Sequence, residues 1–101
     1  MLLTFRARLT LLPLCFLLLS SCGKPLSAEE CNALLDRYVT LLAASDRPGT
    51  TDVELVRLRA QAREKAATAP AFRRCGKEVA RRKFECAMRA PNADVLEQCL
   101  L

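Results

Sequence analysis

The sequence predicts an all-α protein, a small disulfide-stapled bundle of three helices followed by a short C-terminal helix. β-branched and aromatic residues are scarce and no stretch alternates cleanly over many positions, so strand signals are poor. Apolar residues instead recur at helical spacing in several segments. The four cysteines after residue 27 form an even set, which in a small exported domain is typical of a disulfide framework.

The first helix is predicted over residues 28–44. Ser27 and Glu30 have the spacing of a capping box, in which each side chain satisfies a backbone N–H group at the helix start. We expect the ring of Tyr38 in the core and its hydroxyl at the rim. The helix should end before the turn signal Asp-Arg-Pro-Gly at residues 46–49. Its apolar face consists of Cys31, Leu34, Leu35, Tyr38, Leu41 and Leu42.

A second helix is predicted from about Thr51 to residue 67. Thr51 and Glu54 repeat the capping-box spacing of the first helix. The apolar stripe that follows is weaker than the first one, and it consists of Leu55, Leu58, Ala62 and Ala66.

A third, continuous helix is predicted from about Pro70 to the residue before Pro91. Proline is tolerated in the first turn, where backbone N–H groups lack intrahelical partners, and it ends a helix elsewhere. Gly76 is a local weakness of up to about 1 kcal/mol relative to alanine. The inner seam consists of Phe72, Cys75, Val79 and Cys86, and it is widened by Ala80, Phe84 and Ala87.

A short closing helix follows Asn92, which is a suitable N-cap residue. Its apolar positions are Val95, Leu96, Cys99 and Leu100. Because the predicted loops are brief, neighbouring helices should be antiparallel.

The first residues have the architecture of a signal peptide. Arg6 and Arg8 form a positively charged region, an apolar run follows over residues 9–19, and two small serines come next. As a helix, residues 9–21 would rise only ~20 Å, which is short of the ~30 Å hydrocarbon core of a bilayer. A permanent transmembrane span is therefore the weaker alternative.

The run Leu19-Ser20-Ser21-Cys22 resembles the lipobox of bacterial lipoprotein precursors, with a branched apolar residue and two small residues before the cysteine. This resemblance covers about the first quarter of the chain. It implies a diacylglyceryl thioether on Cys22, cleavage before this residue and usually N-acylation, and several acyl chains would make a stable palmitate-type membrane anchor. Neither Cys15 nor Cys31 follows such a run. An ordinary signal peptide cut near Ser21 stays open as the alternative.

The lipobox divides the chain into a removed signal peptide over residues 1–21, a lipidated cysteine with a short tether over residues 22–27, and a single helical domain over residues 28–101. Residues 23–27 would reach at most ~17 Å when extended, so the domain should sit close to the bilayer. In lipoproteins of this class an acidic residue after the acylated cysteine favours the inner membrane. Here that residue is Gly23, so the resemblance implies the outer membrane, facing the periplasm or the surface.

Helix geometry predicts how the cysteines pair. On one continuous helix Cys75 and Cys86 would lie ~16 Å apart, far beyond the ~7 Å limit for the Cα separation of a disulfide. The preferred pairing is Cys31–Cys75 with Cys86–Cys99, since the first two lie level near the starts of parallel helices and the others flank the break at Pro91. Cys31–Cys86 with Cys75–Cys99 stays open, at a mismatch of roughly 12 Å. A zinc site of four thiolates is a further competitor, although Cys-x-x-Cys pairs and histidine are lacking.

Residues 73–89 carry a local excess of five positive charges, in a chain of net charge +5. Such a basic patch suits anionic lipid headgroups, the sugar phosphates of lipopolysaccharide or an acidic protein partner. A solvated outer face of the third helix is the simpler interpretation and stays open. The cations are Arg73, Arg74, Lys77, Arg81, Arg82, Lys83 and Arg89.

The residue types argue against catalysis. Histidine is absent, and no nucleophile elbow, Gly-rich phosphate loop or carboxylate-rich metal motif occurs. We therefore expect no enzyme, no cofactor, no metal and no nucleic acid partner, and an exchangeable disulfide would be needed to revive a redox role. The sequence predicts a small envelope lipoprotein that acts as a binding or structural module, or alternatively a peripheral module that binds anionic lipid through the basic third helix.

Overall fold

The computed structural model describes residues 24–101. The predicted signal peptide and the lipidation site Cys22 lie outside the described residues. Over residues 24–101 the chain forms helices and no strand, which confirms the predicted all-α class. The helices are α2 (Ala28–Asp46), α3 (Asp52–Ala67), α4 (Pro70–Arg73), α5 (Cys75–Glu78), α6 (Arg81–Met88) and α7 (Ala93–Leu100).

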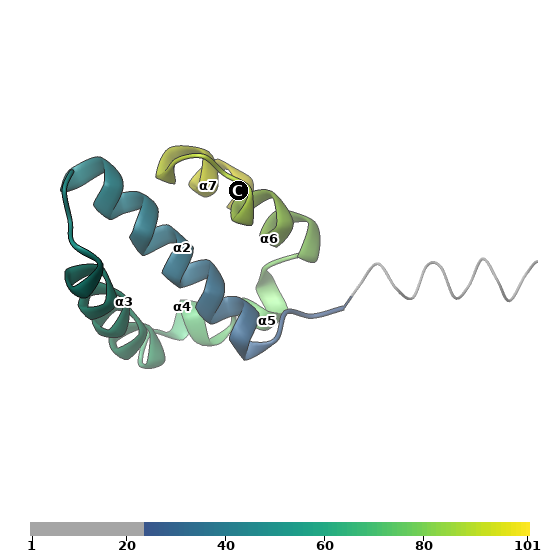
Figure 1. Ribbon diagram of the computed structural model, residues 1–101. Coiled ribbons are helices and arrows are strands. Elements are labelled where there is room, and N and C mark those ends of the chain that lie inside the picture. The colour runs from purple at the N-terminus through teal and green to yellow at the C-terminus, as the bar shows by residue number, and fades with distance from the viewer. Residues whose placement is uncertain (1–23) are drawn as a thin grey trace, which may run out of the picture.

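Helix α2 is the centre of the domain. Helix α3 lies along one side of it, the pair α6 and α7 lies along the other, and α4 and α5 cross at its N-terminal end (Figure 1). The predicted capping box at its start is confirmed, because the Ser27 hydroxyl accepts from the Glu30 N–H group at 3.1 Å and the Ser27 N–H group donates to Glu30 at 3.0 Å. The turn after it contains Gly49 at a φ of 90°, in the left-handed region that suits glycine.

Two further predicted caps are present. The Thr51 hydroxyl accepts from the Glu54 N–H group at 3.2 Å at the start of α3, although only this half of the predicted capping box forms. The Asn92 carboxamide oxygen accepts from the Val95 N–H group at 2.9 Å at the start of α7. The turn between α6 and α7 is also held from α2, because Arg37 donates to the Ala90 carbonyl oxygen at 2.8 Å.

The prediction of a continuous third helix is wrong. Arg74 separates α4 from α5, and Val79 and Ala80 are extended, with ψ angles of 112° and 144°. Helices α4, α5 and α6 also lack a side-chain cap. The break turns the chain so that α5 packs against the start of α2 while α6 packs beside α2 and α7. The burial gained by these contacts outweighs the propensity for one long helix.

The predicted inner seam is only partly buried. Cys75 is buried and Phe72 and Val79 pack against it, but Cys86 and Ala80 are exposed. Ala87, which was expected at the edge of the seam, is fully buried at 0% exposure. The break at residues 79–80 rotates α6, so its inward face is set independently of α5.

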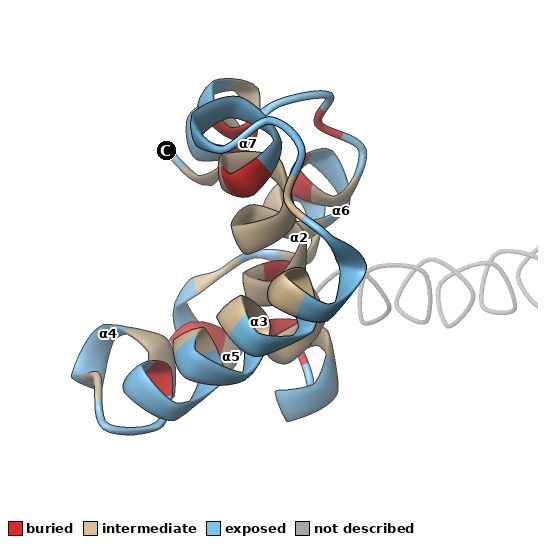
Figure 2. Cartoon of the chain, turned by 60° about the vertical axis from the view of Figure 1, so that its left-hand side comes forward, coloured by how far each residue is buried: buried red, intermediate tan, exposed pale blue. Residues whose placement is uncertain are grey.

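The core is small and has two parts. The larger cluster joins α2, α6 and α7 around Leu34, Ala87, Ala90 and Leu96, and the smaller one consists of Leu26, Cys31 and Cys75. Phe84 packs against both clusters. Figure 2 shows the buried positions on the inward sides of the helices and exposed positions over much of α3 and α4.

Both preferred disulfides are present. Cys31 and Cys75 join α2 to α5 at a Cα separation of 6.2 Å, and Cys86 and Cys99 join α6 to α7 at 5.6 Å. Tyr38 also lies as predicted, because it packs against the larger cluster while its hydroxyl donates to Glu97. That hydrogen bond to a carboxylate raises the pKa of Tyr38 above its usual value.

Candidate functional site

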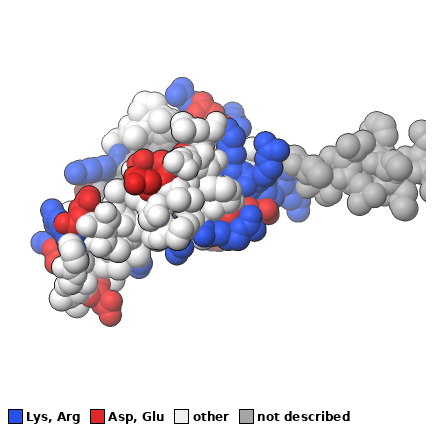
Figure 3. All heavy atoms as spheres, turned by 90° about the horizontal axis from the view of Figure 1, so that it is seen from above, with Lys and Arg blue, Asp and Glu red and all other residues white. Residues whose placement is uncertain are grey.

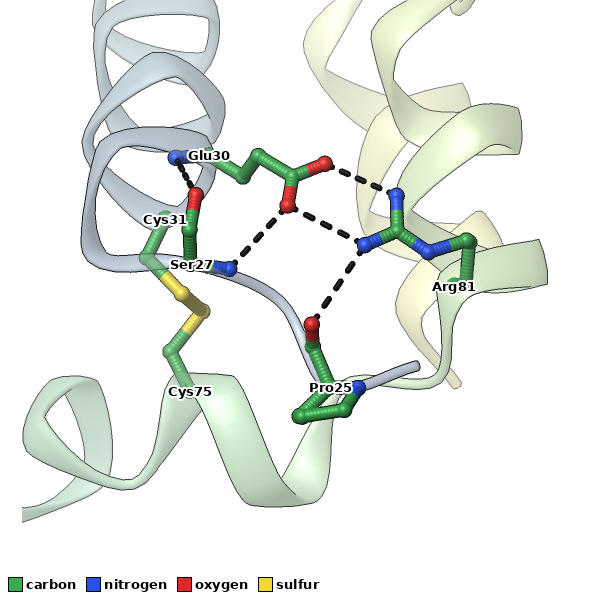
Figure 4. The surroundings of a disulfide bond; sticks show 6 residues. All are labelled: Pro25, Ser27, Glu30, Cys31, Cys75 and Arg81. Carbon is green, nitrogen blue, oxygen red and sulfur yellow. Dashed lines mark hydrogen bonds and ion pairs between the residues drawn. A yellow bond between two sulfur atoms is a disulfide. The ribbon is translucent and has the colours of Figure 1, made fainter. Parts of the chain in front are cut away.

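The chain before α2 is fixed to the domain by a clamp of three polar groups (Figure 4). The carboxylate of Glu30 accepts from two nitrogens of the Arg81 guanidinium, at 2.8 and 3.1 Å. The same guanidinium lies 3.4 Å from the carbonyl oxygen of Pro25, to which it donates. A bidentate pair of this kind fixes orientation as well as distance. The clamp therefore ties residue 25 to the starts of both α2 and α6.

Leu26 adds an apolar contact to the clamp. It is 5% exposed and packs beside the disulfide between Cys31 and Cys75. Gly76 in α5 allows this approach, because a Cβ atom built there would lie 2.8 Å from the carbonyl oxygen of Leu26, closer than real Cβ contacts. Gly76, which the sequence analysis identified only as a weak point of the third helix, thus allows α5 to pack directly against the N-terminal segment.

The segment that was expected to be a tether is consequently shorter than residues 22–27. Its last residues belong to the domain, since Leu26 lies in the core. Four Cα–Cα steps separate Cys22 from Leu26, and they span at most ~14 Å. The end of the domain that holds α5 and the start of α2 therefore lies within that distance of Cys22.

The predicted basic patch is divided between paired and unpaired side chains. Arg81 binds Glu30, and Arg74 forms an ion pair with Glu78 at 2.9 Å. Lys83 donates to the carbonyl oxygen of Leu101 at 3.0 Å. The four remaining cations of the patch are exposed and form no ion pair within residues 24–101, and one of them, Arg89, lies apart at the C-terminal end of α6. We call the other three, Arg73, Lys77 and Arg82, the free basic set.

Positive side chains gather at one end of the molecule. Figure 3 shows Lys and Arg side chains concentrated at the end of the domain where the described chain begins. The clamp residue Arg81 and the groove residue Arg73 belong to this end, since they contact Pro25 and line a groove with Leu26. The structure thus brings part of the predicted patch next to the segment that follows Cys22, whereas Arg89 lies at the far end of α6.

A groove opens beside the clamp between α2, α3 and α4. Its volume is about 350 Å³. Leu26, Ala67 and Phe72 supply apolar surface, and the side chains of Arg63 and Arg73 contribute positive charge. Arg63 is held in place by Asp36, which accepts from its Nε atom at 3.0 Å. That ion pair raises the pKa of Arg63, so its charge is permanent.

The sequence analysis did not predict the burial of Leu26, the ion pair of Asp36 with Arg63 or the groove, although the burial of Leu26 has a local sequence signal. Leu26 precedes the N-cap residue Ser27 and packs with Cys31 at the fourth helical position, which is the spacing of a hydrophobic staple. The ion pair of Asp36 with Arg63 spans 27 positions in the sequence, and the groove combines residues of several successive helices. They have no local signature.

The clamp predicts a pH dependence of stability. Hydrogen bonds from Arg81 and from the Ser27 backbone lower the pKa of Glu30 from 4.5 to about 2. A carboxyl group whose pKa is lower in the folded chain contributes stability that is full above pH 4.5 and is lost as the pH falls toward 2. Glu30→Gln should therefore destabilise the protein at neutral pH and reduce the loss of stability on acidification. Urea unfolding at a series of pH values measures both effects.

Glu29→Gln is the matched control, because this exposed neighbour forms no ion pair among residues 24–101. It removes the same charge from the same helical turn. If the two variants follow one common pH profile, the ion pair between Glu30 and Arg81 does not contribute to stability.

No family model, no curated protein and no solved structure matches this chain. Within the described part of the chain, no helix is both long and apolar enough to cross a membrane. The same residues contain no cluster of three or more metal-ligating side chains.

Proposed function

We propose that the protein is a small lipid-anchored protein of the bacterial cell envelope, attached through Cys22 and most compatible with the outer membrane. Its disulfide-stapled helical domain serves as a binding or structural module beside the bilayer. The lipobox-like run at residues 19–22 supports the anchor, and Gly23 after the cysteine supports the outer membrane.

The burial of Leu26 is the observation that carries this proposal. An anchor on Cys22 would hold the domain by at most ~14 Å of chain, which is about twice the ~5–7 Å thickness of the headgroup and interfacial region of one leaflet. The clamp of Glu30 and Arg81 would also limit the tilt of the domain, because it fixes residue 25 to two helices. The proposed module therefore presents one defined end to the membrane.

The anchor is tested in cells by palmitate labelling and by the mass of the purified mature chain. The unaltered protein should incorporate label and show the added mass of the acyl groups, starting at Cys22. Cys22→Ser should carry no label and remain an unprocessed precursor in the membrane fraction. Normal processing of that variant would support an ordinary signal peptide and overturn the anchor.

The second candidate function is direct binding of anionic lipid, and the free basic set favours it. Arg73, Lys77 and Arg82 are exposed and without an ion pair in the described chain. Near an anionic membrane surface each such cation contributes about 1 kcal/mol. Together with a short anchor, three of them would fix the domain against headgroups that carry negative charge.

Vesicle binding of the unacylated chain from residue 23 onward tests this second function. Binding to phosphatidylcholine vesicles that contain phosphatidylglycerol should be stronger than to pure phosphatidylcholine and should weaken with salt. Replacing Arg73, Lys77 and Arg82 by glutamine should weaken it on the order of a hundredfold. The same change at Arg47, Arg57 and Arg89, which are also exposed, should have much less effect. Absence of binding at low and high salt excludes this function.

A further inference from the structure

We propose that the groove between α2, α3 and α4 holds one anionic phospholipid of the bilayer, with the phosphate at Arg73 and the upper part of an acyl chain against Phe72 and Leu26. This inference rests on the proposed membrane-proximal function and assigns it a specific site. It goes beyond a general attraction of the basic end to charged lipid, because it requires one lipid molecule in a cavity of defined shape.

The first argument is the amphipathic lining of the groove. Leu26, Ala67 and Phe72 form apolar walls, and Gly76 also lines the groove. With a volume of about 350 Å³, the groove can hold part of a phospholipid but not both of its acyl chains. A ligand that is apolar along one part and anionic at one end matches this distribution.

The second argument is charge complementarity. Arg73 is exposed at the groove and has no ion-pair partner among residues 24–101, so its five guanidinium N–H donors are available to an anion. Arg63 also lines the groove, and its Nε and Nη2 atoms donate to Asp36. This ion pair fixes the guanidinium and leaves its Nη1 atom without a partner among residues 24–101. Phosphate oxygens are well suited to such forked donors. A purely hydrocarbon occupant would face both cations without neutralising them.

The third argument is position. Leu26 is both a wall of the groove and the first buried residue of the described chain, four positions after Cys22. An anchor on Cys22 would therefore place the groove within ~14 Å of chain from the lipid surface. The molecules that the groove meets most often at that depth are phospholipids, and the cations select those with net negative charge.

The test uses a soluble lipid, so that it does not depend on acylation. The oxidised chain from residue 22 with Cys22→Ser retains both disulfides and every core residue of the described structure. We expect saturable binding of monomeric dihexanoyl-phosphatidylglycerol in an NMR titration, with amide shifts concentrated at Ala67, Phe72 and Gly76. Dihexanoyl-phosphatidylcholine should bind at least about tenfold more weakly, because its choline ammonium cancels the net charge of its phosphodiester and is repelled by the two arginines. Inorganic phosphate should bind more weakly by a similar factor, because it has no acyl chain for the apolar walls.

Two pairs of variants locate the site. Arg73→Gln should weaken binding about tenfold, whereas Arg74→Gln, a neighbour of equal charge that is paired with Glu78, should change it less than about twofold. Ala67→Trp should fill the groove and abolish saturable binding. Ala60→Trp is its control, because Ala60 is an exposed alanine two turns earlier on α3 that does not line the groove. Circular dichroism checks that each variant keeps its helical content.

The outcomes separate this inference from the proposed function. Equal binding of the neutral lipid or of free phosphate overturns the inference, and so does an equal effect of Arg73→Gln and Arg74→Gln. Salt-dependent vesicle binding without any binding of the soluble anionic lipid also overturns it, while it leaves the proposed membrane function in place. Absence of palmitate label from the unaltered protein, in contrast, overturns the anchor and does not change the result of the titration.

Discussion

Replacing Cys31 and Cys75 together by alanine should leave the protein largely unfolded at 37 °C. On the chain-entropy model, a cross-link over this loop contributes about 4 kcal/mol, because it restricts the unfolded chain. Removal of a native disulfide from a small exported domain often abolishes folding at 37 °C, because the core of such a domain supplies little stability by itself. Alanine keeps the buried sites apolar and avoids an unsatisfied hydroxyl. Thermal unfolding followed by circular dichroism measures the loss.

The matched control removes the other disulfide by Cys86→Ala with Cys99→Ala. Its shorter loop predicts a loss of about 3 kcal/mol. The first double variant should therefore be the less stable of the two, also because it disturbs the cluster that holds Leu26. Equal stability of the first variant and the unaltered protein would show that packing alone holds the fold.

Leu96→Ala should be the most damaging single substitution in the core. Leu96 is 1% exposed and is the largest side chain below 2% exposure among residues 24–101. Truncation of a buried leucine costs about 2–5 kcal/mol, because transfer free energy is lost and a cavity remains. In a domain of this size that is a large fraction of the total. Urea unfolding should show a lower midpoint with an unchanged slope.

Leu101→Ala provides the control for this prediction. It is the same substitution five residues later at a side chain that is 93% exposed. Its effect should stay within about 0.5 kcal/mol. A similar loss for both variants would mean that the cluster of α2, α6 and α7 does not form the main core.

Local signals predicted the ends of most helices. Ser27 and Asn92 are N-caps in the structure as in the sequence. The turn at Gly49 follows the first helix as expected, although α2 extends to Asp46, two residues beyond the predicted end at residue 44. Such signals are reliable because a cap satisfies backbone N–H groups within a few residues of itself. The all-α class follows from the same local information.

The third helix could not be predicted in this way. Its interruption at Val79 and Ala80 depends on what α5 and α6 contact, namely the start of α2 on one side and α7 on the other. Only Gly76 hinted at it, as a weak position. The disulfide pairing was nevertheless predicted correctly, although one premise, a continuous helix through Cys75 and Cys86, was wrong.

The candidate site was predicted only as a list of cations. The sequence could not distinguish Arg81, which is held by Glu30 and Pro25, from Arg73, which forms no ion pair in the described chain. The groups that pair with Arg81 lie more than fifty positions before it in the sequence, so local spacing could not identify it as paired. The groove depends on three separate helices and on the approach of Leu26 to Gly76, none of which is visible in a local pattern.

The two disulfides also determine how the domain would carry a mechanical load. Tension applied between residue 24 and residue 101 would pass along the covalent route from Cys31 across to Cys75, then through α5 and the start of α6 to Cys86 and across to Cys99. The chain between Cys31 and Cys75 would bear no force, and neither would the turn into α7. A pull at the membrane could therefore extend only the short remaining segments while the hairpin of α2 and α3 stays folded.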